Sequence, residues 1–274
     1  MRSRVALLLA AGALTLPAFS QATFSAPSEP GQAAPARAGA LVPDMVPVAN
    51  RDSFNPSPQQ VRPQPRPRPR PRPRRSLFPV ARVRASVALR ERPRGRVAAR
   101  VAPSTEFGSP QVLNVAKRRG RWLGVVTTAL PNNRLAWVRR DHPAVRTARV
   151  GYSLRADLSA RMLVLKRDGR VVKRVRVAIG RPGSTTPTGR FSVTDKLRGG
   201  DYGSYYGCCI LALSGRQPNP PPGWTGGNRL AIHGTNAPGT IGSAASAGCL
   251  RASDADLQVL MRRVPLGTPV FIRP

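Results

Sequence analysis

The chain has 274 residues and a formal net charge of +33 at pH 7, from 45 lysines and arginines against 12 acidic residues. Its length allows one or two domains with additional segments. The three cysteines are too few for a disulfide framework, and their odd number predicts a free thiol if the protein is secreted. The charge predicts a preference for anionic partners.

The first 22 residues have the pattern of a secretory signal peptide. Arg2 and Arg4 precede the apolar run 5–19, and small residues follow in Ser20-Gln21-Ala22. The run is too short for a comfortable membrane span, and no other stretch is long and apolar enough. We therefore expect export to the cell wall. Retention at the membrane is the alternative if the signal is not cleaved.

Residues 23–103 are predicted to be a disordered linker rich in proline and arginine. Over 66–74 the two residue types alternate strictly. Proline removes backbone donors and favours extended polyproline II, and repulsion between the arginines stretches the chain further. The linker is either an electrostatic tether to anionic wall polymers or the membrane surface, a proline-rich ligand, or a solvated spacer. Because we expect export, we do not expect nucleic acid as a physiological partner.

A small β-module is predicted over 104–147. Its three short runs are 111–116, 121–126 and 135–139, and the turn Pro131-Asn132-Asn133 separates the last two. About 40 residues are marginal for independent stability. Trp122 and Trp137 are expected to form the core of the module in preference to a binding platform, and His142 is expected to be inert.

Residues 148–274 are predicted to form a β-rich domain in which strands alternate with glycine, proline and aspartate turns. Asp168-Gly169 is a hairpin signal between two alternating runs. One helix is expected to begin after the N-cap Ser253 and to end before Pro265. This helix would pack the preceding loop against the sheet.

Cys249 and His233 are candidates for covalent catalysis. A cysteine needs a base to become a thiolate, and His233 is the histidine that lies near Cys249 in the sequence. Gly248 lets the backbone approach a substrate, and its N–H group, with that of Cys249, is expected to face a developing oxyanion. The alternative is that Cys249 is a small buried hydrophobic residue.

The other two cysteines, Cys208 and Cys209, are neighbours in an apolar run that is predicted to be a strand. A bridge between neighbouring residues is strained and rare, so we expect none between them. Adjacent strand residues point to opposite faces, so we expect no shared zinc site with Cys249 and His233. One of them could form a reversible disulfide with Cys249.

The segment 158–272 resembles the catalytic domain of the L,D-transpeptidase family, often called YkuD-type. The motifs that carry the resemblance are Thr186-Pro187-Thr188-Gly189-Arg190-Phe191, Ile232-His233-Gly234-Thr235, Ser246-Ala247-Gly248-Cys249-Leu250-Arg251 and Leu266-Gly267-Thr268-Pro269-Val270. Most members of the family carry a histidine where this chain has Ala247. The resemblance implies a mainly β fold: a β-sandwich catalytic domain with one helix after the nucleophile loop. Residues 104–147 are similar to the SH3-like module that precedes this domain in some actinobacterial members.

The resemblance also implies an enzyme that acts on peptidoglycan. Cys249 would attack a carbonyl of a stem tetrapeptide and expel the terminal D-alanine, and the amine of a second stem would resolve the thioester into a 3→3 cross-link. His233 would act as general base and acid, oriented by the backbone carbonyl of Gly234. Carbapenems would acylate the thiol as mimics of the donor. No cofactor or metal is expected, and we expect a monomer. The alternatives are hydrolysis of the thioester, or a wall-binding protein with weak or no catalysis, which Ala247 motivates.

Five further residues are candidates for substrate binding. Arg251 could pair with a substrate carboxylate or lie on the surface. Tyr205 and Tyr206 could line the donor pocket or belong to the core at a strand start. Trp224 lies in the aperiodic segment 215–227 and could gate a cleft or anchor a packed loop. Ser246, from the cysteine motif, is the fifth.

Overall fold

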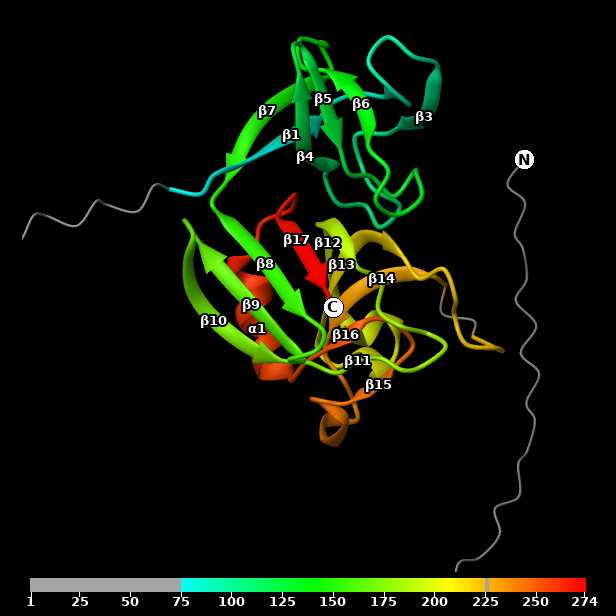
Figure 1. Ribbon diagram of the computed structural model, residues 1–274, viewed down its shortest axis with the longest axis vertical. Helices are drawn as coiled ribbons and strands as arrows, with labels where there is room; N and C mark the ends of the chain where they lie inside the picture. The colour runs from blue at the N-terminus through cyan, green and yellow to red at the C-terminus, as the bar shows by residue number, and fades with distance from the viewer. Residues whose placement is uncertain (1–74, 225–226) are drawn as a thin grey trace, which may run out of the picture. The chain divides into compact units, whose positions relative to one another are not determined.

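The computed structural model describes residues 75–224 and 227–274, and these residues are mainly β-stranded (Figure 1). One α-helix occurs among them, α1 (Asp254–Arg263), directly after the segment that carries Cys249. The prediction of a mainly β fold with one helix after the nucleophile loop is confirmed. The predicted signal peptide and the Arg-Pro run 66–74 lie outside the described residues. None of the described helices has the length and apolar character needed to cross a membrane.

The N-terminal sheet has seven strands in the order β3-β2-β6-β5-β4-β1-β7. They are β1 (Phe78–Val83), β2 (Val87–Arg90), β3 (Val97–Val101), β4 (Val112–Arg119), β5 (Trp122–Val125), β6 (Ala136–Arg139) and β7 (Val145–Val150). Strand β1 pairs with both β4 and β7, so the sheet is complete only with the first strand in place.

The predicted boundary between linker and module is wrong. Strands β1, β2 and β3 lie within 78–101, which was expected to be disordered, and the module runs to Val150. Each of these strands holds one arginine among mostly apolar residues, and further arginines lie in the connections between them, so the high arginine content of the segment hides the strands. Ala81 and Leu89 are fully buried in the core of the module. The added strands supply the apolar area that about 40 residues would lack.

The two tryptophans of the module differ in burial. Trp137 is buried and its ring packs against the backbone of Gly124, with the guanidinium of Arg119 5.3 Å from the ring centroid. Trp122, at the start of β5, is only half-buried and lines a surface cavity with Arg90 and His142. The core role predicted for both therefore holds for Trp137 alone.

The C-terminal domain is built on an eight-stranded sheet in the order β10-β9-β8-β17-β12-β13-β14-β16. Its strands are β8 (Tyr152–Asp157), β9 (Met162–Arg167), β10 (Arg170–Arg176), β12 (Gly189–Arg198), β13 (Cys209–Arg216), β14 (Arg229–His233), β16 (Leu250–Arg251) and β17 (Pro269–Arg273). A parallel pair, β11 (Ile179–Gly180) and β15 (Ala244–Ser246), lies outside this sheet. Three short 3₁₀ helices complete the described part: η1 (Gly199–Tyr202), η2 (Ser204–Tyr206) and η3 (Pro238–Thr240).

Local signals in the sequence set two of these elements. Asp168 and Gly169 both have positive φ, 51° and 84°, and make the two-residue turn between β9 and β10. Ser253 caps α1 because its Oγ accepts a hydrogen bond from the N–H of Asp256 at 3.2 Å. The buried side chains of α1 pack into the core of the C-terminal domain, against β13 and β14.

Both sheets belong to one compact unit, and side-chain hydrogen bonds connect them. The buried Asn114 of β4 donates to the carbonyl of Gly267 at 3.0 Å. Its Oδ1 accepts from Arg190 of β12 at 2.7 Å. Asn133 of the module donates to the carbonyl of Thr188 at 3.1 Å.

Candidate active site

The backbone register of two strands brings Cys249 and His233 to one place. Strands β14 and β16 pair in parallel, with His233 opposite Arg251 and Ile232 opposite Leu250. Cys249 immediately precedes β16, and His233 ends β14. Both residues line the same pocket, so the pair suggested by the sequence shares one site.

His233 is fully buried and oriented by its own backbone neighbour. Nδ1 lies 2.6 Å from the carbonyl oxygen of Gly234, which selects the tautomer with the proton on Nδ1. Nε2 is buried and has no hydrogen-bond partner in the part of the chain that is described. Burial lowers the pKa of His233 from 6.5 to about 4, although the bond to Gly234 acts in the opposite direction. The imidazole is therefore neutral at pH 7 and has a lone pair that can accept a proton.

Cys249 is half-buried, and its sulfur is desolvated. Burial raises the pKa of the Cys249 thiol to about 11, against weaker contributions from a backbone hydrogen bond at Ala231 and the charge of Arg251. Sγ lies 3.8 Å from the carbonyl oxygen of Arg229, its hydrogen-bond acceptor. The resting pair is thus a neutral thiol and a neutral imidazole.

Two residues of the cysteine motif do not have the role that the sequence predicts. The N–H of Gly248 donates to Oγ of Ser246 at 3.1 Å, so it is not available to an oxyanion. Ser246 is fully buried, and its hydroxyl donates to the carbonyl of Cys249 at 2.6 Å, so it is not a substrate ligand either. A buried hydroxyl satisfies its hydrogen bonds locally, and here this holds the nucleophile loop. The N–H of Cys249 has no hydrogen-bond partner within residues 75–224 and 227–274 and is the remaining candidate for an oxyanion donor.

Gln217 is a site residue that the sequence analysis missed. Its Nε2 lies 3.0 to 3.1 Å from the carbonyl oxygens of Ser184, Thr185 and Ala247. The side chain therefore connects the nucleophile loop to the turn at 181–187. It also lies against Gly248, where a Cβ would come 2.0 Å from Nε2 and where φ is +121°. No local sequence signal marks a glutamine with three partners so distant in the chain.

The candidate substrate-binding residues surround the imidazole. Tyr205 and Tyr206 lie in η2, not at a strand start, and their ring centroids are 5.6 and 5.0 Å from that of His233. Trp224 packs on Tyr205 at 5.7 Å, and its Nε1 donates to Gly227 at 2.7 Å. All three aromatic residues line the pocket of Cys249, so Trp224 is at the cleft.

Arg251 is 5% exposed, so the alternative of a surface arginine is wrong. Its guanidinium carbon lies 5.7 Å from the ring centroid of Tyr205. Its Nε is buried without a hydrogen-bond partner among the described residues. Arg251 therefore contacts Tyr205, which lines the pocket, but is not itself among the lining residues.

The structure joins Cys208 to Cys209 in a disulfide, contrary to the expectation that neighbours would not bridge, and leaves Cys249 free. Strand β13 begins at Cys209, so Cys208 lies just outside the regular strand. The N–H of Cys208 donates to Asp254 at 3.0 Å, and the carbonyl of Cys209 accepts from the N–H of Gly234 at 3.0 Å. The predicted disulfide with Cys249 is therefore not formed. No cluster of three or more His, Cys, Asp or Glu side chains that could hold a metal occurs within the described ranges.

Comparison with known proteins identifies the family. The sequence profile of the L,D-transpeptidase catalytic domain, YkuD, matches residues 151–272. The protein YkuD of Bacillus licheniformis, named as an L,D-transpeptidase, is 34% identical over 127 residues, which are 46% of this chain and 67% of that protein. This chain belongs to the L,D-transpeptidase family.

Another relative and two solved structures are also similar to parts of this chain. YkuD of Bacillus subtilis is 34% identical over 125 residues, 45% of this chain, and the match spans 66% of that protein's length. An L,D-transpeptidase from Mycobacterium smegmatis is 17% identical, with a TM-score of 0.38 over 60% of this chain and 90% of that one. The catalytic domain from the L,D-transpeptidase of E. faecium is 23% identical, with a TM-score of 0.33 over 44% of this chain and 96% of that one.

Proposed function

We propose that this L,D-transpeptidase domain forms 3→3 cross-links between peptidoglycan stem peptides through a thioester on Cys249, outside the cytoplasm. The observation that carries the proposal is the neutral pair of Cys249 and His233 at one aromatic pocket. A thiol that is protonated at rest needs a base at the moment of attack, and a neutral buried imidazole is a base of that kind.

In the proposed reaction, Cys249 is the nucleophile and His233 transfers the protons. Sγ of Cys249 attacks the donor carbonyl while Nε2 of His233 takes the thiol proton. The C–N bond to the terminal D-alanine then breaks, and its nitrogen receives the proton from Nε2. The amine of a second stem attacks the thioester, the C–S bond breaks, and a proton from that amine returns to the sulfur through His233. The N–H of Cys249 faces the oxyanion, and Arg251 binds a stem carboxylate.

Two alternatives share parts of this scheme. Water in place of the second amine would give hydrolysis and a trimmed stem. A wall-binding protein without efficient catalysis would retain the fold but not form the acyl-enzyme. Because Ala247 lies at the position of the histidine found in most members, this alternative has a specific motive. Acylation of the Cys249 thiol distinguishes the wall-binding protein, which would not be acylated, from the transpeptidase and the hydrolase, which would be.

The experiment is a reaction of the purified full-length protein with disaccharide tetrapeptides, followed by mass spectrometry of the products. Dimers linked between the third residues of two stems are expected, and trimmed monomers alone would mean hydrolysis. Intact-mass measurement after incubation with a carbapenem is expected to show one adduct. The Cys249→Ser variant should give neither the dimers nor the adduct. A wild-type protein without adduct and without dimers would favour the binding protein.

The anionic partners remain a proposal from the sequence, since the Arg-Pro run lies outside the described residues. Wall polymers with phosphate, or the membrane surface, would attract this run electrostatically, and binding should weaken steeply with salt. Full-length protein and a chain that starts at Arg75 should therefore differ in binding to isolated walls at low salt. Equal binding by the two would exclude the tether and leave the solvated spacer.

A further inference from the structure

The loop 104–109 of the N-terminal module, between β3 and β4, is a compact structure. Ser104 and Pro110 form a bridge across its base. The N–H of Thr105 donates to the carbonyl of Ser109 at 2.8 Å. Oγ1 of Thr105 accepts from the N–H groups of Phe107 and Ser109 at 3.3 and 3.1 Å. These bonds hold the loop in one conformation. The side chains of Thr105, Glu106 and Phe107 contact the C-terminal domain.

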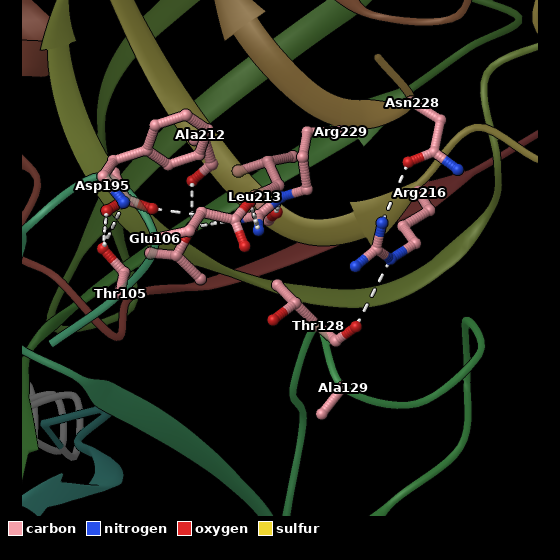
Figure 2. Close-up of polar contacts among 12 residues, drawn as sticks. Thr105, Glu106, Thr128, Ala129, Asp195, Ala212, Leu213, Arg216, Asn228 and Arg229 are labelled. Carbon is pink, nitrogen blue, oxygen red and sulfur yellow. Dashed lines mark hydrogen bonds and ion pairs between the residues drawn. The ribbon is translucent and has the colours of Figure 1, made fainter. Parts of the chain in front are cut away.

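The first connection from this loop is an ion pair (Figure 2). Oε1 of Glu106 lies 2.7 Å from Nη1 of Arg229, whose side chain is 14% exposed. The same guanidinium donates to the carbonyl of Leu213 at 3.1 Å and to Oγ1 of Thr194 at 2.8 Å. It also lies 3.7 Å from the buried carboxylate of Asp195. All of its nitrogens thus have partners, so the position of Arg229 is well determined.

A second side chain of the loop completes this cluster. The hydroxyl of Thr105 donates to Oδ1 of the fully buried Asp195. The ring of Phe107 lies 5.6 Å from the guanidinium carbon of Arg229, in cation–π contact. Three consecutive residues of the module therefore surround one arginine of the C-terminal domain.

Arg229 is also the residue whose backbone contacts the nucleophile. It is the first residue of β14, and His233 is the last. Its carbonyl oxygen is the acceptor for the thiol of Cys249 at 3.8 Å. The side chain that Glu106 holds and the carbonyl that receives the thiol belong to the same residue, so a displacement of one is transmitted to the other.

An aromatic row leads from the same loop to the imidazole. Phe107 contacts Tyr202 with ring centroids 6.1 Å apart and an interplanar angle of 79°. Tyr202 contacts Tyr206 at 6.5 Å, and Tyr206 contacts His233 at 5.0 Å. Edge-to-face pairs of this kind have a preferred geometry, so each ring restricts the next.

We propose that loop 104–109 is a positioning element of the active site, in which Glu106 sets the place of Cys249 through Arg229 and Phe107 sets that of His233 through Tyr202 and Tyr206. This inference rests on the proposed function to the extent that Cys249 is the nucleophile. Other contacts between the module and the C-terminal domain, such as Asn133 with Thr188, do not involve these residues. They serve as an internal comparison.

The test uses the full chain and saturation kinetics of carbapenem acylation, which separate the maximal acylation rate from the half-saturating concentration. We expect Glu106→Gln and Phe107→Leu each to lower the maximal rate by about 10-fold, with the half-saturating concentration changed less than about two-fold. Glu106→Asp keeps the charge and should retain part of the rate. Thermal unfolding establishes that each variant is folded.

Two control variants separate positioning from simple attachment of the module. Asn133→Gly suits the positive φ of 64° at this position but removes the bonds to Thr188 and Arg190. Glu91→Gln removes a charge that pairs with Arg96 on the exposed surface of the module. Both should keep the wild-type acylation rate. Wild-type rates in the Glu106 and Phe107 variants, or an equal loss in Asn133→Gly, would overturn the proposal.

A second measurement keeps the test independent of the enzymatic function. Iodoacetamide alkylates Cys249 whether or not the protein is a transpeptidase, and the other two cysteines are joined in a disulfide. If the wild-type protein forms no carbapenem adduct, the proposed function fails. The alkylation rate of Cys249 then still tests whether loop 104–109 positions this residue. A change in the alkylation rate of at least about three-fold in Glu106→Gln, with none in Asn133→Gly, would support positioning. Identical rates in the two variants would refute it.

Discussion

Lowering the pH from 7 to 4 should destabilise this protein through His233. In the folded state, burial lowers the pKa of His233 from 6.5 to about 4. Between these values the unfolded chain binds a proton that the folded chain does not, so the free energy of unfolding falls as the pH falls. The gap corresponds to up to about 3 kcal/mol, at about 1.4 kcal/mol per pH unit.

The assay is urea unfolding followed by tryptophan fluorescence at several pH values from 4 to 7, on the wild type and on His233→Gln. The variant lacks the titrating group. From pH 7 to 4, the free energy of unfolding of the wild type should therefore fall by up to about 3 kcal/mol more than that of the variant. The carboxylates contribute equally to both profiles. Parallel profiles between pH 4 and 7 would refute the assignment of a buried neutral imidazole.

The same burial has a kinetic consequence. Nε2 can accept the thiol proton only while the ring is neutral, and His233 stays neutral down to about pH 4. We therefore expect the rate of carbapenem acylation at pH 5 to remain within about two-fold of its value at pH 7. A fall centred near pH 6.5 would show that the imidazole titrates as in water.

Four further outcomes follow from the site and the module. Cys249→Ser should abolish cross-linking and His233→Ala should slow acylation by about 10²–10⁴-fold, both measured on soluble stem peptides. Gly248→Ala should also slow acylation, because the new Cβ would collide with Gln217 at a positive φ; wild-type rates would show that the loop adapts freely. A chain that starts at Ser104 should lose the cooperative unfolding of the module, because it lacks β1, β2 and β3, and an unchanged circular dichroism melting curve would contradict the sheet order.

Features with a local cause could be predicted from the sequence. The Asp168-Gly169 turn and the cap at Ser253 depend on residues within a few positions of each other, and the structure contains both. The motifs around His233 and Cys249 indicated one site, and the two residues share one pocket.

Features that depend on distant partners could not be predicted. Gln217 and Arg229 act through carbonyls and carboxylates tens of residues away. The sequence does not show whether the hydroxyl of Ser246 faces a substrate. In the folded loop it donates to the carbonyl of Cys249 and accepts from the N–H of Gly248. Strands β1, β2 and β3 were missed for a different reason, because the high arginine content of the segment concealed them.

The parallel register of β14 and β16 has a consequence for how this domain can change. His233 and Arg251 face each other across two short strands, while the chain between them passes through a long excursion at 234–248. Residues 236–243, which include η3, lie outside both strands, so a residue added or removed there would leave this register intact. A single residue inserted inside β14 would instead turn His233 to the opposite face of the sheet. The alignment of His233 with Arg251 therefore tolerates a change of length in the excursion but not within the strand.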